Sequence, residues 1–207
     1  MQSSHPSATT VLQVMTHPKT LGAFLLLIIS AVLNFITGSW IQGYLPNTVV
    51  SPDLLLLHLP YLPIFHTIAE VSLFFSLVLL AYIIYKKQLR SLPFFLINLA
   101  TVYAVRAVLI TLTPLAQTSP LKGQPNIYGA TFSGMYPSGH IALSTIIFLL
   151  VRKYGGSQAL TRVAGMLVCM QGISLLLSHS HYGIDLIGGM MLAYVVYRWM
   201  VRFKSSV

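Results

Sequence analysis

Residues 20–41 read TLGAFLLLIISAVLNFITGSWI, an apolar stretch without a charged side chain. A helix of about 20 apolar residues is long enough to cross the hydrocarbon core of a bilayer. The rest of the chain has the same character, since 56% of its 207 residues are hydrophobic and only 7% are charged. Its mean hydropathy is +0.78. Too few polar side chains are present to cover a water-soluble core, so we expect an all-α integral membrane protein.

Six apolar stretches are predicted to span the membrane as helices, of which the fourth is short. They cover about residues 20–41, 62–85, 92–113, 139–153, 160–178 and 183–203. The first stretch lacks a small-residue cleavage pattern, so we expect it to remain as a span and not to be removed as a signal peptide. No internal repeat or linker divides the chain. Residues 19–207 are therefore predicted to form one six-helix catalytic domain, preceded by a mobile cytoplasmic tail at residues 1–18.

The basic residues predict the orientation of these helices. Most of the twelve cations lie on one side, namely Lys19, Lys86, Lys87, Arg90, Arg152, Lys153, Arg162, Arg198, Arg202 and Lys204. Because Lys and Arg concentrate in cytoplasmic loops, both termini are predicted to be cytoplasmic. The loops at about 42–61, 114–138 and 179–182 then face outward from a bacterial inner membrane or a eukaryotic endomembrane or plasma membrane. The net charge of +9 forms no basic face of the kind that binds nucleic acid.

Ionisable residues inside predicted spans are the best indicators of function, because they are costly in lipid and usually face a bundle interior. Glu70, Arg106 and Asp185 fall within predicted helices, and His140 and His181 lie at the outer ends of two others. A helical rise of about 1.5 Å per residue places all five in the outer half of the membrane. We therefore predict one site at the outer-leaflet side.

Each of these residues also has a structural interpretation. Glu70 and Arg106 could form an ion pair that locks two helices together, and His140 could cap a helix. His181 and Asp185 are one helical turn apart, so they could form a buried structural hydrogen bond. The same spacing relates His66 to Glu70, and the common depth of these groups favours a shared site.

The stretch TFSGMYPSGHIALS, residues 131–144, interrupts the apolar pattern before the fourth predicted span. A phosphate binds well at a helix N-terminus, where free N–H groups and the positive end of the dipole meet the anion. Gly139 lets the backbone approach closely, and the Ser138 hydroxyl can donate a further hydrogen bond. His140 places a proton donor beside the same oxygens.

His181 and Asp185 have the spacing of an activated nucleophile. A carboxylate that binds one imidazole nitrogen fixes the tautomer and leaves the other nitrogen free to attack phosphorus. His140 would then protonate the leaving oxygen. This chemistry calls for no metal and no cofactor. An alternative uses His179, His181 and Asp185 as zinc ligands, although a catalytic zinc site also needs an open position.

The chain resembles the type 2 phosphatidic acid phosphatase superfamily of six-helix membrane enzymes. The resemblance rests on PSGH at residues 137–140 and on His181 and Asp185 at His-x-x-x-Asp spacing. SHSHYGIDLI at 178–187 and YAVRAVLITLTPL at 103–115 are similar to stretches of the sphingomyelin synthases within that superfamily. Glu70 fits the same branch, and the resemblance covers about residues 50–200.

This resemblance implies a role for each catalytic candidate. His181 is expected to form a phosphohistidine, Asp185 to orient it, and His140 to act on the leaving group and then on the acceptor. Glu70 is expected in the catalytic chamber. The candidates for substrate contact are Arg106, Ser138, Gly139, Tyr136, His179, Tyr182 and Lys122.

The sequence departs from both branches. The phosphatases carry an arginine six residues before the nucleophilic histidine, where this chain has Leu175, and their lysine motif is also absent. The synthases carry Cys-Gly-Asp shortly before Ser-Gly-His, whereas here the stretch ends in Pro137, as in phosphatases. These differences leave the choice between transfer and hydrolysis open.

Charge favours a phosphodiester as the donor. A phosphomonoester brings nearly two negative charges and needs several cations around its oxygens. This chain offers Arg106 inside the membrane and Lys122 in an outer loop. We therefore predict attack on a glycerophospholipid, release of diacylglycerol, and transfer of the phospho-headgroup to a lipid alcohol such as ceramide, or to water. The alternatives are a phosphatase of phosphatidate or isoprenyl diphosphates, and a transporter or scaffold in which Glu70 and Arg106 line a pore.

The outer loop at residues 51–63, SPDLLLLHLPYLP, is apolar enough to lie in the membrane interface near a lipid entrance, although a simple packed loop fits equally. The loop from Pro114 to Tyr136 is expected to roof the site or to be an ordinary irregular connection, given its Gly and Pro content.

Overall fold

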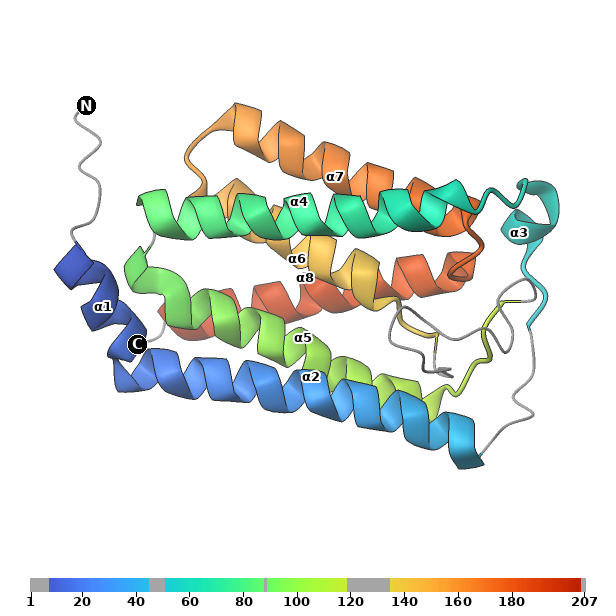
Figure 1. Ribbon diagram of the computed structural model, residues 1–207, viewed down its shortest axis with the longest axis horizontal. Coiled ribbons are helices and arrows are strands. Elements are labelled where there is room, and N and C mark those ends of the chain that lie inside the picture. The colour runs from blue at the N-terminus through green and yellow to red at the C-terminus, as the bar shows by residue number, and fades with distance from the viewer. Residues whose placement is uncertain (1–7, 45–50, 88, 119–134, 206–207) are drawn as a thin grey trace.

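The structure, a computed structural model, describes residues 8–44, 51–87, 89–118 and 135–205, and all regular secondary structure in these ranges is helical (Figure 1). Six helices are long, namely α2 (Pro18–Tyr44), α4 (Ile64–Lys87), α5 (Leu92–Leu112), α6 (Gly139–Tyr154), α7 (Gln158–Leu177) and α8 (Gly183–Ser205). The short ones are α1 (Ala8–Thr16), α3 (Leu54–His58) and the 3₁₀ helix η1 (Leu89–Ser91).

Five helices of the described chain are long and apolar enough to cross a membrane, namely α2, α4, α5, α7 and α8. This confirms the all-helical membrane fold. The predicted fourth span, α6, has 16 residues and is shorter than a usual transmembrane helix. It packs against α4, α5, α7 and α8. Neighbouring helices therefore enclose α6, and a sixth span remains a prediction.

The packing is organised around α6. Helix α2 runs along α5, α4 runs along α7, and α6 packs against α8 between these pairs (Figure 1). The main hydrophobic core surrounds α6 and includes the fully buried side chains of Phe95, Ile146 and Leu150. The bundle thus presents the N-terminus of α6 at one end, enclosed by its neighbours.

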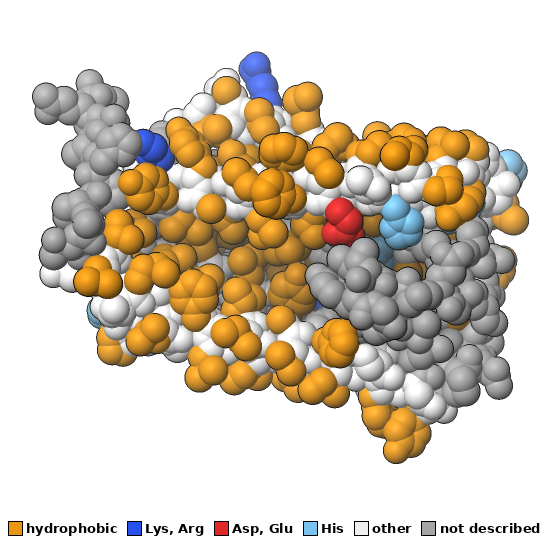
Figure 2. Space-filling view, in the orientation of Figure 1, with side chains coloured by type: hydrophobic (Ala, Val, Ile, Leu, Met, Phe, Trp, Pro, Cys, Tyr) orange, Lys and Arg blue, Asp and Glu red, His pale blue; other side chains and the backbone are white. Residues whose placement is uncertain are grey.

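The outer surface of the bundle is apolar. Hydrophobic side chains cover the visible faces of the long helices (Figure 2), and large ones such as Leu25, Ile28 and Phe74 are each more than half exposed. A water-soluble protein does not expose contiguous apolar surface on this scale. Helices satisfy their own backbone hydrogen bonds, so this surface suits contact with lipid.

The expected N-terminal tail is helical over its described part. Residues Ala8–Thr16 form α1, and Val14 packs beside Ala23, Leu92 and Leu96. This apolar contact packs α1 against the start of α2 and α5, and the mobility of residues 1–18 remains a prediction.

Both chain termini lie at one end of the bundle, and α3 lies at the other (Figure 1). The end that carries α3 also holds the N-termini of α6 and α8 and the C-terminus of α7. The ionisable residues singled out in the sequence converge there.

Candidate active site

The site is built around a short turn between α7 and α8. Residues 178–182 are all at least nine-tenths buried, although four of them are Ser or His. Ser178 ends α7, and His179 takes a left-handed backbone with φ of 50°, which reverses the chain. The N–H of Ser180 donates to the carbonyl of Leu175 at 3.0 Å, which closes the turn as in other helix C-caps. We call residues 178–183 the nucleophile turn, after the nucleophile that the sequence predicts at His181.

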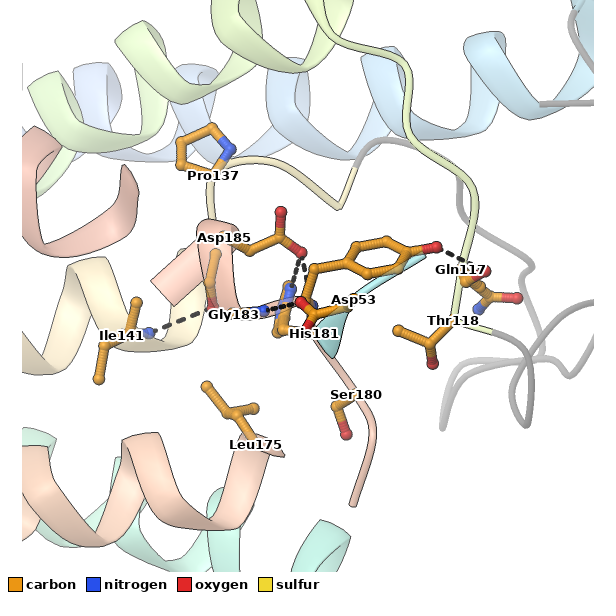
Figure 3. A network of polar contacts seen from close by, with 12 residues as sticks. Asp53, Gln117, Thr118, Pro137, Ile141, Leu175, Ser180, His181, Gly183 and Asp185 are labelled. Carbon is orange, nitrogen blue, oxygen red and sulfur yellow. Dashed lines mark hydrogen bonds and ion pairs between the residues drawn. The ribbon is translucent and has the colours of Figure 1, made fainter. Parts of the chain in front are cut away.

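His181 in this turn pairs with Asp185 in the first turn of α8, as the sequence predicted (Figure 3). The distance from His181 Nδ1 to Asp185 Oδ2 is 3.2 Å, and the same oxygen accepts the N–H of Tyr182 at 3.0 Å. Asp185 is fully buried. A carboxylate on Nδ1 favours the Nδ1–H tautomer, so Nε2 carries the free lone pair.

Burial lowers the pKa of His181 below its ordinary value of 6.5, although the hydrogen bond to Asp185 acts in the opposite direction. Desolvation disfavours the charged form of an imidazole. His181 is therefore a neutral base at neutral pH, which is the form that a nucleophile requires.

Residues Pro137, Ser138 and Gly139 form an elbow that leads into α6. Ser138 is the N-cap, and its hydroxyl oxygen accepts the N–H of Ile141 at 3.5 Å. Its side chain is fully buried, so it supports the helix N-terminus from inside. The backbone N–H of Ser138 donates to the carbonyl of Asp185 at 3.0 Å. The elbow and the nucleophile turn are thus held together through Asp185.

Two glycines of α8 let the elbow approach this closely. A Cβ on Gly189 would lie 2.6 Å from the carbonyl oxygen of Ser138 and 2.4 Å from Cγ2 of Ile141. A Cβ on Gly188 would lie 2.4 Å from the ring of Tyr136. A side chain at Gly189 would push the start of α6 away from α8, whereas one at Gly188 would displace the ring of Tyr136.

Arg106 of α5 holds the elbow from the other side. Its Nε donates to the carbonyl of Pro137 at 2.7 Å, and its Nη1 donates to Oδ1 of Asn34 on α2. A Cβ on Gly139 would lie only 3.1 Å from Nε of Arg106, so the guanidinium lies against the start of α6. The ion pair of Arg106 with Glu70, considered from the sequence, is not formed among the described residues.

Glu70 of α4 instead pairs with His140 of α6, at 3.0 Å between Oε1 and Nε2. The side chains of His140 and Glu70 are 33% and 48% exposed, whereas those of His181 and Asp185 are 7% and 0% exposed. The ring centroids of His140 and His181 are 6.1 Å apart. Two His–carboxylate pairs therefore face each other, one open and one buried.

The other predicted contact residues have partners in the protein. His179 Nε2 lies 3.1 Å from the carbonyl of Leu59, and its ring lies against Tyr61. The hydroxyl of Tyr182 donates to the carbonyl of Gln117 at 3.4 Å. His179 and Tyr182 thus shape the nucleophile turn, as Tyr136 shapes the elbow. Lys122 lies outside the described residues.

Some residues of the site carried no prediction. Asn34 holds Arg106, Ser180 lies 3.3 Å from Nε2 of His66, and Asp53 contacts the start of α8. Asn34 had a signal, because an amide inside an apolar span needs a partner. Within the described residues, no three His, Cys, Asp or Glu side chains converge as a metal site would require.

A family model described as AtPDCT1/2 matches residues 52–201, which is most of the chain. The chain belongs to this family. The matched range contains both His–carboxylate pairs, the elbow and Arg106, and it leaves out Asn34 of α2. The family match therefore covers the part of the chain that holds both pairs, the elbow and Arg106.

Two further comparisons agree with this membership. A phosphatidylcholine:ceramide cholinephosphotransferase 1 from Caenorhabditis elegans is 29% identical over 209 residues, which cover 82% of this chain and 43% of the relative. The chain therefore spans less than half the length of that relative. The first transmembrane PAP2 type phosphatidylglycerolphosphate phosphatase from Bacillus subtilis has the same fold in its crystal structure, with a TM-score of 0.51 and 16% identity, covering 92% of this chain and 98% of that one.

These comparisons confirm the relationship predicted from the sequence, both to the phosphatase superfamily and to its sphingomyelin synthase branch. By their names, both relatives are enzymes of lipid phosphate chemistry, which is the class of enzyme that the sequence predicted.

Proposed function

We propose that this protein is a membrane lipid phosphotransferase that carries a phospho-headgroup on His181 from a glycerophospholipid to a lipid alcohol. One observation carries the proposal, namely the two His–carboxylate pairs that face each other beside the N-terminus of α6. One pair supplies a buried, oriented nucleophile. The other supplies a more exposed acid and base.

In the first step, the lone pair of His181 Nε2 attacks phosphorus and the bond from phosphorus to the glycerol oxygen breaks. The Nε2 of His140 faces Glu70, so its Nδ1 is the nitrogen left to give a proton to the departing oxygen. Diacylglycerol leaves, and the headgroup phosphate remains bonded to His181. Arg106 and the first N–H groups of α6 offset the negative charge on the phosphate oxygens.

In the second step, His140 is neutral and takes the proton of an acceptor hydroxyl. The acceptor oxygen attacks phosphorus, the nitrogen–phosphorus bond breaks, and its electron pair returns to Nε2 of His181. Asp185 keeps the same imidazole orientation throughout. If water replaces the lipid alcohol in this step, the reaction becomes a hydrolysis.

The charge around the site supports a phosphodiester donor. Arg106 is the one Lys or Arg of the described chain that lies at the site, since the others lie toward the opposite end of the long helices. A single cation suits a diester with one negative charge better than a monoester with nearly two. The name of the nematode relative, a cholinephosphotransferase, agrees with a diester headgroup and with a ceramide acceptor.

The proposal also includes the orientation of the site. In this proposal the cationic ends of the helices lie in the cytoplasm, and α6 crosses the membrane in addition to the five long apolar helices, so the two His–carboxylate pairs belong to the outer-leaflet side. The separation of the site from the Lys and Arg residues at the other helix ends supports this orientation.

The test uses purified wild-type protein and His181→Ala with labelled phosphatidylcholine, phosphatidylethanolamine and phosphatidate, with and without ceramide. We expect diacylglycerol and a new headgroup-bearing sphingolipid only when ceramide and a diester are present, and neither product with the variant. Inorganic phosphate from phosphatidate alone would make the protein a phosphomonoesterase. Full activity of His181→Ala would remove the nucleophile from the proposal.

A further inference from the structure

An outer segment of the chain lies directly against the nucleophile turn. This segment, residues 53–62, contains α3 and precedes α4. Its Asp53 accepts the backbone N–H of Gly183 through Oδ2 (Figure 3), and the N–H of Leu62 donates to the carbonyl of Leu177 at 2.8 Å. A third bond joins Leu59 to His179 within the same turn. The segment therefore contacts the turn through Asp53 and Leu59, and the end of α7 beside the turn through Leu62.

Asp53 uses its two carboxylate oxygens for two different helices. Oδ1 accepts the N–H groups of Leu55 at 2.8 Å and Leu56 at 3.3 Å, which caps α3. Oδ2 accepts the N–H of Gly183, the first residue of α8. Helix N-termini leave N–H groups without partners inside the helix, and a carboxylate satisfies them well. An asparagine has only one acceptor oxygen, so it could serve one of these helices but not both.

Stabilising α3 does not by itself explain why Asp53 binds both α3 and α8. None of the residues of α3 is buried, and Leu54 is 78% exposed. Helix α3 therefore adds nothing to the hydrophobic core. On the other side of the bond, Gly183 follows His181 by two residues and precedes Asp185 by two, so its position sets the geometry of the buried pair.

Gly183 is also fitted to this contact. A Cβ at this position would lie 2.8 Å from Cδ1 of Leu55 and 3.3 Å from Oδ2 of Asp53. A methyl group there would displace the exposed side chain of Leu55 and press on the carboxylate oxygen of Asp53 that binds the N–H of Gly183. The hydrogen bond from Gly183 to Asp53 and the absence of a side chain at Gly183 thus both keep the outer segment close to the start of α8.

We propose that Asp53 is a positioning residue for the nucleophile. By fixing the start of α8 against the outer segment, it keeps His181 and Asp185 in the geometry that exposes Nε2 to phosphorus. The inference rests on the proposed role of His181. It adds the prediction that an outer, half-buried carboxylate that touches no reacting atom controls the rate.

The experiment compares Asp53→Asn, Asp53→Glu, Gly183→Ala and the double variant of Asp53→Asn with Gly183→Ala, using diacylglycerol release from phosphatidylcholine with ceramide. A displacement of about 1 Å at a reacting group costs about 100-fold in rate. We expect Asp53→Asn and Gly183→Ala each to lower kcat to about that extent while KM stays within about threefold. Asp53→Glu keeps two acceptor oxygens and should recover part of the loss.

The double variant gives the sharper result. Because both changes act on one contact, their effects should not add, and the double variant should be about as slow as the slower single variant. Ser157→Ala is the matched control, since Ser157 is the N-cap of α7 without a side-chain cap bond. Its kcat should equal that of the wild type. All values are taken per folded molecule, after size-exclusion chromatography.

A wild-type kcat in Asp53→Asn, or fully additive losses in the double variant, would overturn the inference. A loss confined to the yield of folded protein would also overturn it, because a merely structural residue would not change kcat per folded molecule. The result for His181→Ala separates the two proposals. If that variant is inactive while Asp53→Asn is normal, only the positioning role fails; if His181→Ala is active, the proposed function fails.

Discussion

Replacing Asp185 by Asn tests whether the buried pair orients the nucleophile. Oδ2 of Asp185, which is fully buried, accepts two donors, the ring of His181 and the N–H of Tyr182. An amide has nearly the same shape but only one acceptor oxygen. Turned one way, the amide oxygen replaces Oδ2 and still accepts both donors, but it lacks the negative charge that stabilises the imidazole ring when it carries a phosphate, and the amide NH₂ is buried at the Oδ1 position, which has no partner among the described residues. Turned the other way, the NH₂ faces both donors, and His181 adopts the other tautomer, with Nε2 protonated and unable to attack.

The size of the effect follows from that tautomer. Exchanging the carboxylate for an amide behind a catalytic histidine lowers kcat about 10⁴-fold, which corresponds to roughly 5 kcal/mol in the barrier. The loss of one buried hydrogen bond should cost only about 1–3 kcal/mol of folding free energy. We therefore expect Asp185→Asn to remain folded in detergent while its catalysis almost disappears.

The assay measures the initial rate of diacylglycerol release at saturating phosphatidylcholine and ceramide, together with thermal unfolding. Ser174→Ala is the control, because the hydroxyl of Ser174 is equally buried and has no hydrogen-bond partner among the described residues. It should keep kcat within about twofold of the wild type. If Asp185→Asn retained more than about a tenth of the wild-type kcat, the orienting role of the carboxylate would be refuted.

Three further predictions test the electrostatics, the close packing and the support of the site. Because burial lowers the pKa of His181 and only its neutral form attacks, the rate should rise with pH along an acid limb whose midpoint lies below 6.5; a midpoint above 6.5 in a plot of kcat/KM against pH would contradict this. Gly189→Ala should lose about 1–3 kcal/mol of stability, since its Cβ would overlap neighbouring atoms. Gly165→Ala, whose Cβ would lie 3.6 Å from Phe148, should unfold in detergent at or above the wild-type temperature, and equal melting of the two variants would refute the packing argument. Asn34→Leu should lower kcat/KM about tenfold by freeing the guanidinium that it holds, whereas Asn98→Leu, which removes a bond from Nδ2 to a carbonyl of the same helix, should leave it unchanged; similar values for both would show that Asn34 has no special role.

Spacing along the chain predicted contacts within one helical turn better than contacts between helices. His181 and Asp185 are four residues apart, and the structure joins them. His66 and Glu70 have the same spacing, yet Glu70 binds His140 and His66 lies beside Ser180. When a side chain has two possible partners, tertiary packing decides which one it binds. The contact between α4 and α6 cannot be derived from the spacing of residues along the chain.

Composition predicted the membrane fold and the short fourth helix, but not the enclosure of that helix by its neighbours. An apolar residue facing lipid and one facing a neighbouring helix look alike in sequence, so the sequence could not distinguish the surroundings of α6 from those of α2. In the structure α6 is short and enclosed, while α2 exposes residues such as Leu25 and Ile28. The elbow was predicted for its glycine and histidine, but the burial of Ser138 depends on glycines of α8 about 50 residues away.

The unequal exposure of the two histidine pairs bears on the choice between transfer and hydrolysis. His181 is buried with Asp185, so a headgroup phosphate bonded to it would be shielded from bulk solvent on that side. His140 and Glu70 are partly exposed, and the proposed mechanism requires the acceptor hydroxyl to lose its proton there. The acceptor must therefore approach along the α4–α6 side, where the neighbouring surface of α4 is apolar. A lipid alcohol can occupy that surface by burying its chains, whereas water gains nothing from it, and this difference favours transfer.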